Sequence, residues 1–175
     1  MATIFTHPVL PVIAGLIIGK KHVSNRLMLW SSIASIIPDG DVIAFQFGVS
    51  YASELGHRGF THSIIFAGCL GILAVFAAKY LRAKRLAAFL MVFFGAISHP
   101  FLDAFTNGGL GVAAFWPFDK GRYFWPITPI EVSPIGAGFF SGRGVDVIIS
   151  ELFLVWIPML IILLLSKYLM TIIKK

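Results

Sequence analysis

Long apolar runs separated by short polar connectors dominate this sequence. About 20 apolar residues in a helix cross the core of a bilayer, and three runs, 62–81, 86–102 and 149–169, come near that length. Two shorter runs, 8–19 and 27–37, precede them, and we expect these to be tilted or extended by flanking residues. The pattern predicts an all-α membrane protein, a bundle of about five transmembrane helices in one domain over the whole chain.

The segment 105–145 breaks this pattern. It is rich in Gly, Pro and aromatic residues and has no clear period. We expect an ordered loop lying on the membrane, with Trp116, Tyr123 and Trp125 in the interfacial aromatic belt. This loop is predicted to cap one end of the bundle.

Composition supports a membrane protein and argues against a nucleic-acid partner. Hydrophobic residues make up 58% of the chain, and the mean hydropathy is +0.89. The net charge is +6, but the basic residues fall in connectors between apolar runs, which is the pattern of membrane topology. The single Cys69 lies inside an apolar run, which excludes a disulfide framework and a thiolate metal cluster.

Charge also predicts the topology. A chain that begins outside and crosses five times places most of its basic residues on one side, which the positive-inside rule assigns to the cytoplasm: Lys20, Lys21, Arg26, Lys79, Arg82, Lys84, Arg85, Lys167, Lys174 and Lys175. The other side then receives four of the five histidines and all eight acidic residues: His7, His57, His62, His99, Asp39, Asp41, Glu54, Asp103, Asp119, Glu131, Asp146 and Glu151. We therefore expect a multi-pass protein of the plasma (inner) membrane with a site that faces the extracytoplasmic side.

His99 and Asp103 are the first candidate pair for a metal ion. Four residues apart near the end of a predicted helix, they share one face. Imidazole nitrogen and carboxylate oxygen suit zinc, and also manganese or iron, better than calcium. The alternative is a helix end with a hydrogen-bonded histidine and a solvated aspartate.

Asp39 and Asp41 are the second pair, on either side of Gly40 and directly after Pro38. We expect Pro38 to stop the preceding helix and Gly40 to let both carboxylates face one point. Two carboxylates that close repel each other, and a cation removes the repulsion. The alternative is a plain turn.

His57 and His62 are too far apart to share a face of one helix, so a turn at Gly59 must bring them together. Arg58 between them has the fork geometry that suits an anionic oxygen such as phosphate, or a ligating carboxylate. His7 is a further candidate ligand with a weaker signal, because one histidine near a terminus is common. In the loop, Arg122, Glu131 and Arg143 are polar groups among aromatic residues. They are either solvated, or the loop caps the site and an arginine contacts the substrate.

Four motifs together resemble the YdjM-like family: Thr6-His7, Pro38-Asp39-x-Asp41, His57-Arg58-Gly59-x-Thr61-His62-Ser63 and Ser98-His99-x-x-x-Asp103. This family is described as LexA-binding, inner membrane-associated hydrolases or membrane-bound metal-dependent hydrolases. The resemblance implies a multi-span membrane protein with metal-dependent hydrolytic activity and these aspartates and histidines in its site. Because we place the site outside the cytoplasm, we do not expect contact with a cytoplasmic repressor.

The resulting hypothesis is a metal-dependent hydrolase of the phosphodiesterase or phosphatase type. One or two divalent ions, zinc first and manganese or iron next, are expected to be held by His7, Asp39, Asp41, His57, His62, His99 and Asp103. So many ligands exceed the need of one tetrahedral zinc, which leaves room for a second ion or for a carboxylate, Asp41, as general base. Arg58 would hold an anionic group of the substrate.

The expected substrate is a phosphoester in a lipid or other amphiphile, because the site lies at the membrane interface among aromatic residues. An amidase or protease stays open, since zinc hydrolases attack acyl and phosphoryl centres alike. Two other classes use the same ligands: a divalent-metal transporter or channel, and a non-catalytic scaffold whose loops are held together by metal.

Overall fold

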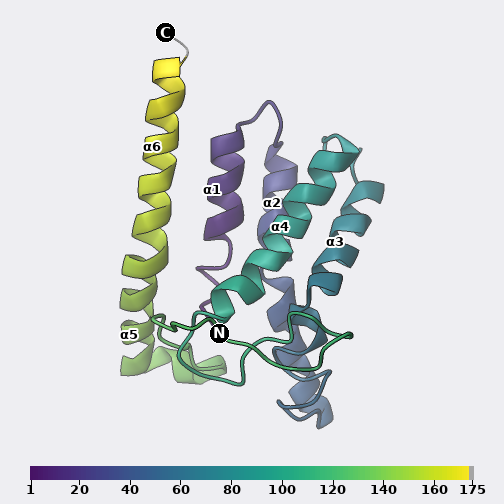
Figure 1. Cartoon of the computed structure of the whole chain (residues 1–175), viewed down its shortest axis with the longest axis vertical. Coiled ribbons are helices and arrows are strands. Elements are labelled where there is room, and N and C mark those ends of the chain that lie inside the picture. The colour runs from purple at the N-terminus through teal and green to yellow at the C-terminus, as the bar shows by residue number, and fades with distance from the viewer. Residues whose placement is uncertain (174–175) are drawn as a thin grey trace.

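This computed structural model describes residues 1–173, and every regular element in that range is a helix (Figure 1). Two isolated β-bridges join Thr106 to Ile130 and Val112 to Tyr123. The elements in chain order are α1 Val9–Ile18, α2 Asn25–Ala34, the 3₁₀ helices η1 Ile37–Phe47 and η2 Phe60–His62, α3 Ile64–Phe76, α4 Arg85–Asp103, the 3₁₀ helix η3 Gly136–Phe140, α5 Gly142–Glu151, the π-helix η4 Leu152–Trp156 and α6 Ile157–Ile173. The all-α prediction is confirmed for these residues.

α4 occupies the centre of the bundle. It packs against α3, α2 and α1, and α1 also packs against α6 (Figure 1). In Figure 1 the α1–α2 and α3–α4 connectors lie at one end of the bundle, together with the end of α6. The N-terminus, η1 and the loop after α4 lie at the other end. Lys174 and Lys175, which the topology prediction placed with the basic connectors, lie outside the described residues.

Within residues 1–173, three helical stretches are long and apolar enough to cross a membrane: Asn25–Phe47, Arg85–Asp103 and Gly142–Ile173. α1 and α3 are apolar but shorter, with 10 and 13 residues. The three longer stretches support a multi-pass protein, and the crossing of the membrane by α1 and α3 stays a prediction.

Two predicted boundaries were wrong. The run 62–81 forms only the 13-residue α3, because the chain turns after Phe76 and Arg82 adopts a left-handed backbone conformation. The run 27–37 instead continues through η1 into a stretch of 23 residues. Pro38 does not end α2, which stops at Ala34. Pro38 lies in the first turn of η1, where a backbone N–H has no partner within the helix, so the missing N–H of proline costs no hydrogen bond.

Small residues let the central helices approach closely. A Cβ added at Gly95 of α4 would lie 2.2 Å from the carbonyl oxygen of Ser31 in α2. The Ser31 hydroxyl donates a hydrogen bond across the same interface to the carbonyl of Met91. In a bilayer there is no hydrophobic driving force between helices, because lipid tails are as apolar as the side chains. Close packing and hydrogen bonds between helices therefore hold them together.

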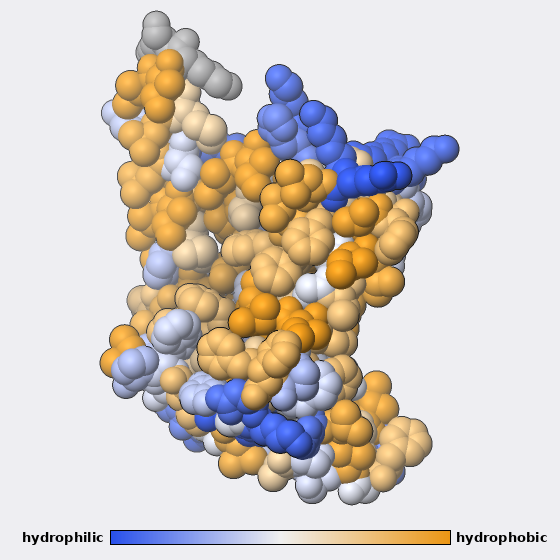
Figure 2. Space-filling model, turned by 45° about the vertical axis from the view of Figure 1, so that its right-hand side comes forward, coloured by the Kyte–Doolittle hydropathy of each residue, from blue (hydrophilic) through white to orange (hydrophobic). Residues whose placement is uncertain are grey.

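Figure 2 shows a largely apolar middle zone, with hydrophilic side chains gathered above it and a mixture of hydrophilic and apolar side chains below it. α6 has no buried residue and exposes large side chains such as Leu160, Leu164 and Leu169. An exposed apolar surface of this extent matches a protein surrounded by lipid.

The segment after α4 is irregular as far as η3 but is tied down by hydrogen bonds. The amide of Trp125 donates to the carbonyl of Ala104 at 2.9 Å, and that of Ile130 donates to Phe105 at 3.1 Å. Its predicted end at residue 145 overlaps the first turn of α5. Its function as a cap stays a prediction.

Candidate metal centre

Five buried donors from four parts of the chain meet at one end of the bundle. His7 precedes α1, Asp39 lies in η1, His62 ends η2, and His99 and Asp103 lie in the last two turns of α4. Each is 7% exposed or less. Donor atoms of four of them, Asp39, His62, His99 and Asp103, all lie within 4.8 Å of one another.

The loop that carries His57 and His62 is tightly folded. The predicted turn is present: the amide of Gly59 donates to the carbonyl of Gly56 at 2.9 Å. Any Cβ at Gly59 would lie 2.2 Å from the carbonyl oxygen of Glu54, so only glycine fits. Arg58 takes a left-handed conformation (φ 64°), and the Ser63 hydroxyl then caps α3 by accepting from the amide of Phe66.

The two central imidazoles present their Nε2 atoms to each other at 3.1 Å. Nδ1 of His99 lies 2.7 Å from the carbonyl oxygen of Ser35, which only accepts, so this nitrogen carries the proton. Nδ1 of His62 lies 3.0 Å from the Thr61 hydroxyl, which donates to Oδ2 of Asp41 at 2.6 Å and can therefore accept from His62. With the proton on Nδ1 of each ring, each Nε2 atom carries a lone pair, and the two lone pairs face one point. This is a tautomer that metal-ligating histidines use.

Three of the four carboxylate oxygens around this point lack a hydrogen-bond donor, whereas Oδ1 of Asp103 accepts from the amide of Ala2 at 2.7 Å. Both oxygens of Asp39 and Oδ2 of Asp103 are buried without a hydrogen-bond partner. Oδ1 of Asp39 lies 3.2 Å from Nε2 of His99, and Oδ2 of Asp103 lies 3.7 Å from Nε2 of His62. Arg58 lies 3.0 Å from Oδ2 of Asp103, but no arginine or lysine of the described residues forms an ion pair with Asp39. A buried carboxylate without partners is costly unless a cation is present. The donor set of two imidazoles and two carboxylates therefore fits a divalent transition-metal ion.

His7 completes the cluster from one side. Its ring stacks on that of His99 with centroids 3.7 Å apart, and its Nε2 lies 3.6 Å from Oδ1 of Asp103. Burial, together with the neighbouring His99, lowers the pKa of His7 to about 3. His7 is therefore neutral near pH 7, and neither of its ring nitrogens has a hydrogen-bond partner. A lone pair of His7 is thus free to act as a ligand.

Asp41 and His57 lie behind His62 rather than around the central point. Oδ1 of Asp41 lies 2.7 Å from Nδ1 of His57, and its Oδ2 accepts from Thr61 and from the amide of Arg58. Asp41, His57 and His62 still form a second group close enough to share an ion. The geometry gives Asp41 two possible tasks, to orient His62 or to bind a second ion.

Arg58 is engaged by the protein itself. Its guanidinium is fully buried, with Nε 3.0 Å from Oδ2 of Asp103, and it donates to the carbonyl of Gly108 and to the hydroxyl of Thr106, both at 2.9 Å. Of the two interpretations from the sequence, substrate contact or ion pair, this geometry favours the ion pair. Arg58 thereby joins the loop after α4 to the candidate metal centre.

The loop residues differ in their placement. Arg122 donates to the backbone carbonyls of His57 and Ser53, at 2.7 and 2.9 Å, and so braces the His57 loop. Arg143 and Glu131 form an exposed ion pair at 3.6 Å. Neither arginine has a contact with the central donors among the hydrogen bonds and ion pairs of the described chain.

Glu151 is the main residue that the sequence reasoning missed. It is 1% exposed, and its carboxylate accepts from the amide and hydroxyl of Thr3 and from the hydroxyl of Thr6. Thr6 also accepts from the indole of Trp156 at 2.7 Å. These bonds fasten the segment that carries His7 to the end of α5. An acidic residue inside an apolar stretch was the signal that could have found it.

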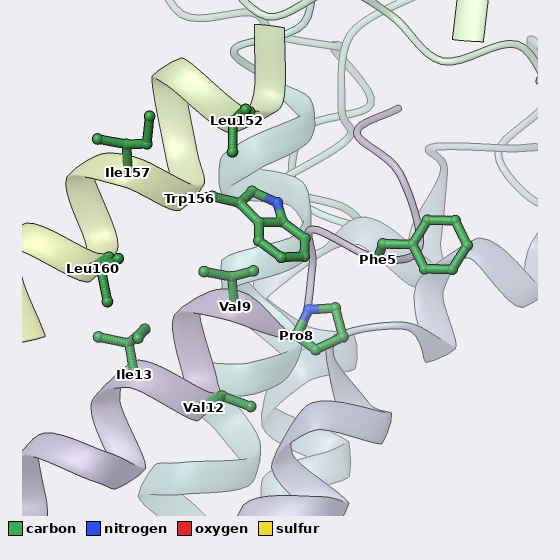
Figure 3. A pocket seen from close by; sticks show the side chains of 9 residues that line it. All are labelled: Phe5, Pro8, Val9, Val12, Ile13, Leu152, Trp156, Ile157 and Leu160. Carbon is green, nitrogen blue, oxygen red and sulfur yellow. The ribbon is translucent and has the colours of Figure 1, made fainter. Parts of the chain in front are cut away.

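An apolar groove runs along α1 and α6 next to this segment (Figure 3). It has a volume of about 440 Å³ and begins at Phe5 and Pro8, on either side of Thr6 and His7. Farther along it is lined by Val12 and Ile13 of α1 and by Leu160 of α6. The groove therefore leads from the metal-centre end of the bundle into its apolar zone.

The fold and the site define an all-helical membrane protein with a buried cluster of histidines and aspartates. Comparison with known proteins supports this class. The profile of the family "YdjM inner membrane protein" matches residues 1–173. The chain is 40% identical over 160 residues to the inner membrane protein YbcI of Escherichia coli (strain K12), which covers 90% of this chain and 92% of that protein. The chain belongs to the YdjM family of inner membrane proteins. No solved structure matches it.

Proposed function

We propose that this protein is a metal-dependent hydrolase of the inner membrane that cleaves a phosphoester in an amphiphile. The observation that carries the proposal is the donor set: four buried groups directed at one point, with both oxygens of Asp39 lacking a hydrogen-bond donor. His7 and the Asp41–His57 pair add donors beyond the four that a tetrahedral ion needs. When bound, a divalent ion supplies an acidified water and a positive charge beside the scissile bond.

The side chains divide the remaining tasks. His62 and His99 are held in the ligating tautomer by Thr61 and Ser35. One oxygen of Asp39 would hold the ion, and the other, which also accepts no hydrogen bond, is placed to take a proton from attacking water, whereas the oxygens of Asp41 are already used. In this proposal Asp39 therefore replaces Asp41 as the general base. Arg58 anchors Asp103 and the loop after α4, which closes over this end of the bundle.

The apolar groove between α1 and α6 supports an amphiphilic substrate. Its walls are apolar, and it ends beside the segment that carries His7 (Figure 3). An acyl chain in the groove would place a polar head group at the metal-centre end. By the positive-inside rule this end is extracytoplasmic, because the basic connectors lie at the other end.

A second candidate function is a scaffold in which metal stabilises the fold. It is favoured by the burial of the cluster, since His7, His62, His99 and Asp103 are all 0% exposed. Structural metal sites are closed, whereas catalytic sites keep one position open to water or substrate.

The test uses the full chain purified in mild detergent and loaded with zinc or manganese. Turnover is measured with bis(p-nitrophenyl) phosphate and with phospholipids in mixed micelles, for wild type, Asp39→Asn and the control His22→Ala. A hydrolase is expected to release product with wild type and His22→Ala, and at least about 100-fold more slowly with Asp39→Asn. Metal bound by wild type and by His22→Ala, without turnover on either substrate class, would favour the scaffold.

A further inference from the structure

A basic pocket lies at the end of the bundle opposite the metal centre. The α1–α2 connector contributes Lys21 and His22, and the α3–α4 connector contributes Lys79, Arg82 and Lys84. The pocket has a volume of about 450 Å³, and none of the residues that line it is acidic. Figure 2 shows hydrophilic side chains gathered at this end, directly above apolar ones.

An apolar groove continues from this pocket along α1 and α4. It has a volume of about 650 Å³ and is lined by Ala14 and Ile18 of α1 and by Leu90 and Phe94 of α4, among others. His22 and Ala87 line both the pocket and the groove, so the two spaces are contiguous. Together they form one cleft with a cationic head and an apolar tail.

We propose that this cleft binds an anionic phospholipid of the surrounding bilayer. Four cationic side chains in one pocket complement a phosphate-bearing head group. The groove below lies on helices whose outer surface is apolar, where an acyl chain is the occupant that the bilayer supplies. Membrane topology requires basic connectors but no groove, so the continuity of the two spaces is what indicates a lipid rather than surface charge alone. The site shares no residue with the metal centre and does not depend on the proposed function.

The chain offers a closely matched pair of variants. Lys21→Gln with Lys84→Gln removes two charges from the pocket lining. Lys20→Gln with Arg85→Gln removes two charges from the adjacent positions, which are exposed and do not line the pocket. Both variants have the same net charge and change neighbouring positions at the same end of the bundle.

The experiment measures binding of phosphatidylglycerol and phosphatidylcholine to the detergent-purified full chain by native mass spectrometry. Wild type is expected to retain phosphatidylglycerol in preference to phosphatidylcholine. Lys21→Gln/Lys84→Gln should weaken phosphatidylglycerol binding about tenfold, and Lys20→Gln/Arg85→Gln less than about threefold. Ala14→Phe, which fills the apolar groove, should weaken phosphatidylglycerol binding without any change of charge.

Three results would overturn the proposal. They are equal retention of both lipids by wild type, an equal loss in the two double variants, and no effect of Ala14→Phe. The second of these would show attraction to surface charge only. If a double variant does not fold, the single substitutions Lys21→Gln and Lys20→Gln give the same comparison.

Discussion

His62 and His99 direct the lone pairs of their Nε2 atoms at each other across 3.1 Å. The opposite nitrogen of each ring faces an acceptor, Thr61 for His62 and the Ser35 carbonyl for His99. Two acceptors cannot hydrogen-bond to each other, whereas one cation between them can bind both lone pairs. Two nitrogens bound to one tetrahedral zinc at about 2.0–2.1 Å are about 3.3 Å apart, close to this separation.

The first prediction concerns metal content. Wild-type protein is expected to bind about one or two equivalents of zinc or another transition metal, and His99→Ala and Asp39→Ala should lose it, since each removes a central donor. His22→Ala, which changes the histidine of the basic end, is the control and should retain metal. Inductively coupled plasma mass spectrometry measures the content, and no metal in wild type after zinc reloading would contradict a metal centre.

The second prediction concerns metal removal. A chelator should lower the unfolding temperature of wild type in detergent, because an ion that binds only the folded state stabilises it by about 2.7 kcal/mol at 100 times its dissociation constant. Asp39→Ala should unfold at the same temperature with and without chelator. An unchanged wild-type transition, measured by tryptophan fluorescence, would contradict the prediction.

The third prediction tests the hydroxyl behind His62. Thr61→Val removes the hydroxyl that bridges Nδ1 of His62 and Oδ2 of Asp41, and it should weaken metal binding about 10- to 100-fold, as loss of such outer partners does elsewhere. Thr171→Val is the matched control, since that hydroxyl bonds only within α6, to the carbonyl of Lys167. Competition with a fluorescent zinc chelator gives the affinities, and equal affinities in the two variants would argue against this function of Thr61.

The fourth prediction concerns Glu151. Glu151→Ala leaves the buried donors of Thr3 and Thr6 without their acceptor and should reduce the free energy of unfolding by about 1–3 kcal/mol or more. Glu131→Ala removes an exposed carboxylate paired with Arg143 and should cost less than about 1 kcal/mol. Chemical unfolding in detergent measures the free energy of unfolding of both variants. The prediction fails if this free energy falls by the same amount in the two.

The fifth prediction concerns the packing of α2 and α4. Gly95→Ala places a methyl group against the Ser31 carbonyl and should destabilise the fold by about 1–3 kcal/mol. At Gly68 of α3 nothing lies within 4 Å of an added Cβ, so Gly68→Ala should be neutral or stabilise the helix by up to about 1 kcal/mol. Thermal unfolding of the two variants measures the difference, and similar transitions would mean that the helices separate easily at Gly95.

The sequence by itself determined the helical class, the membrane setting and the pairing of His99 with Asp103. These depend on hydropathy over a run of residues and on the repeat of a helix, which places residues four apart on one face. It also placed a turn at Gly59, because His57 and His62 could not meet along one helix. Such properties are local, and neighbouring residues in the chain decide them.

Only the tertiary structure decided how the pieces divide their tasks. Asp39 and Asp41 are equivalent in the sequence, yet one faces the centre without partners while the other is bonded to His57 and Thr61. Arg58 pairs with Asp103, and Glu151 reaches Thr3, because packing of distant helices brings these groups within a few ångströms. The length of α3 depended likewise on where the chain turns toward α4. Hydropathy and spacing carry no information on such distances, which the packing of the whole bundle decides.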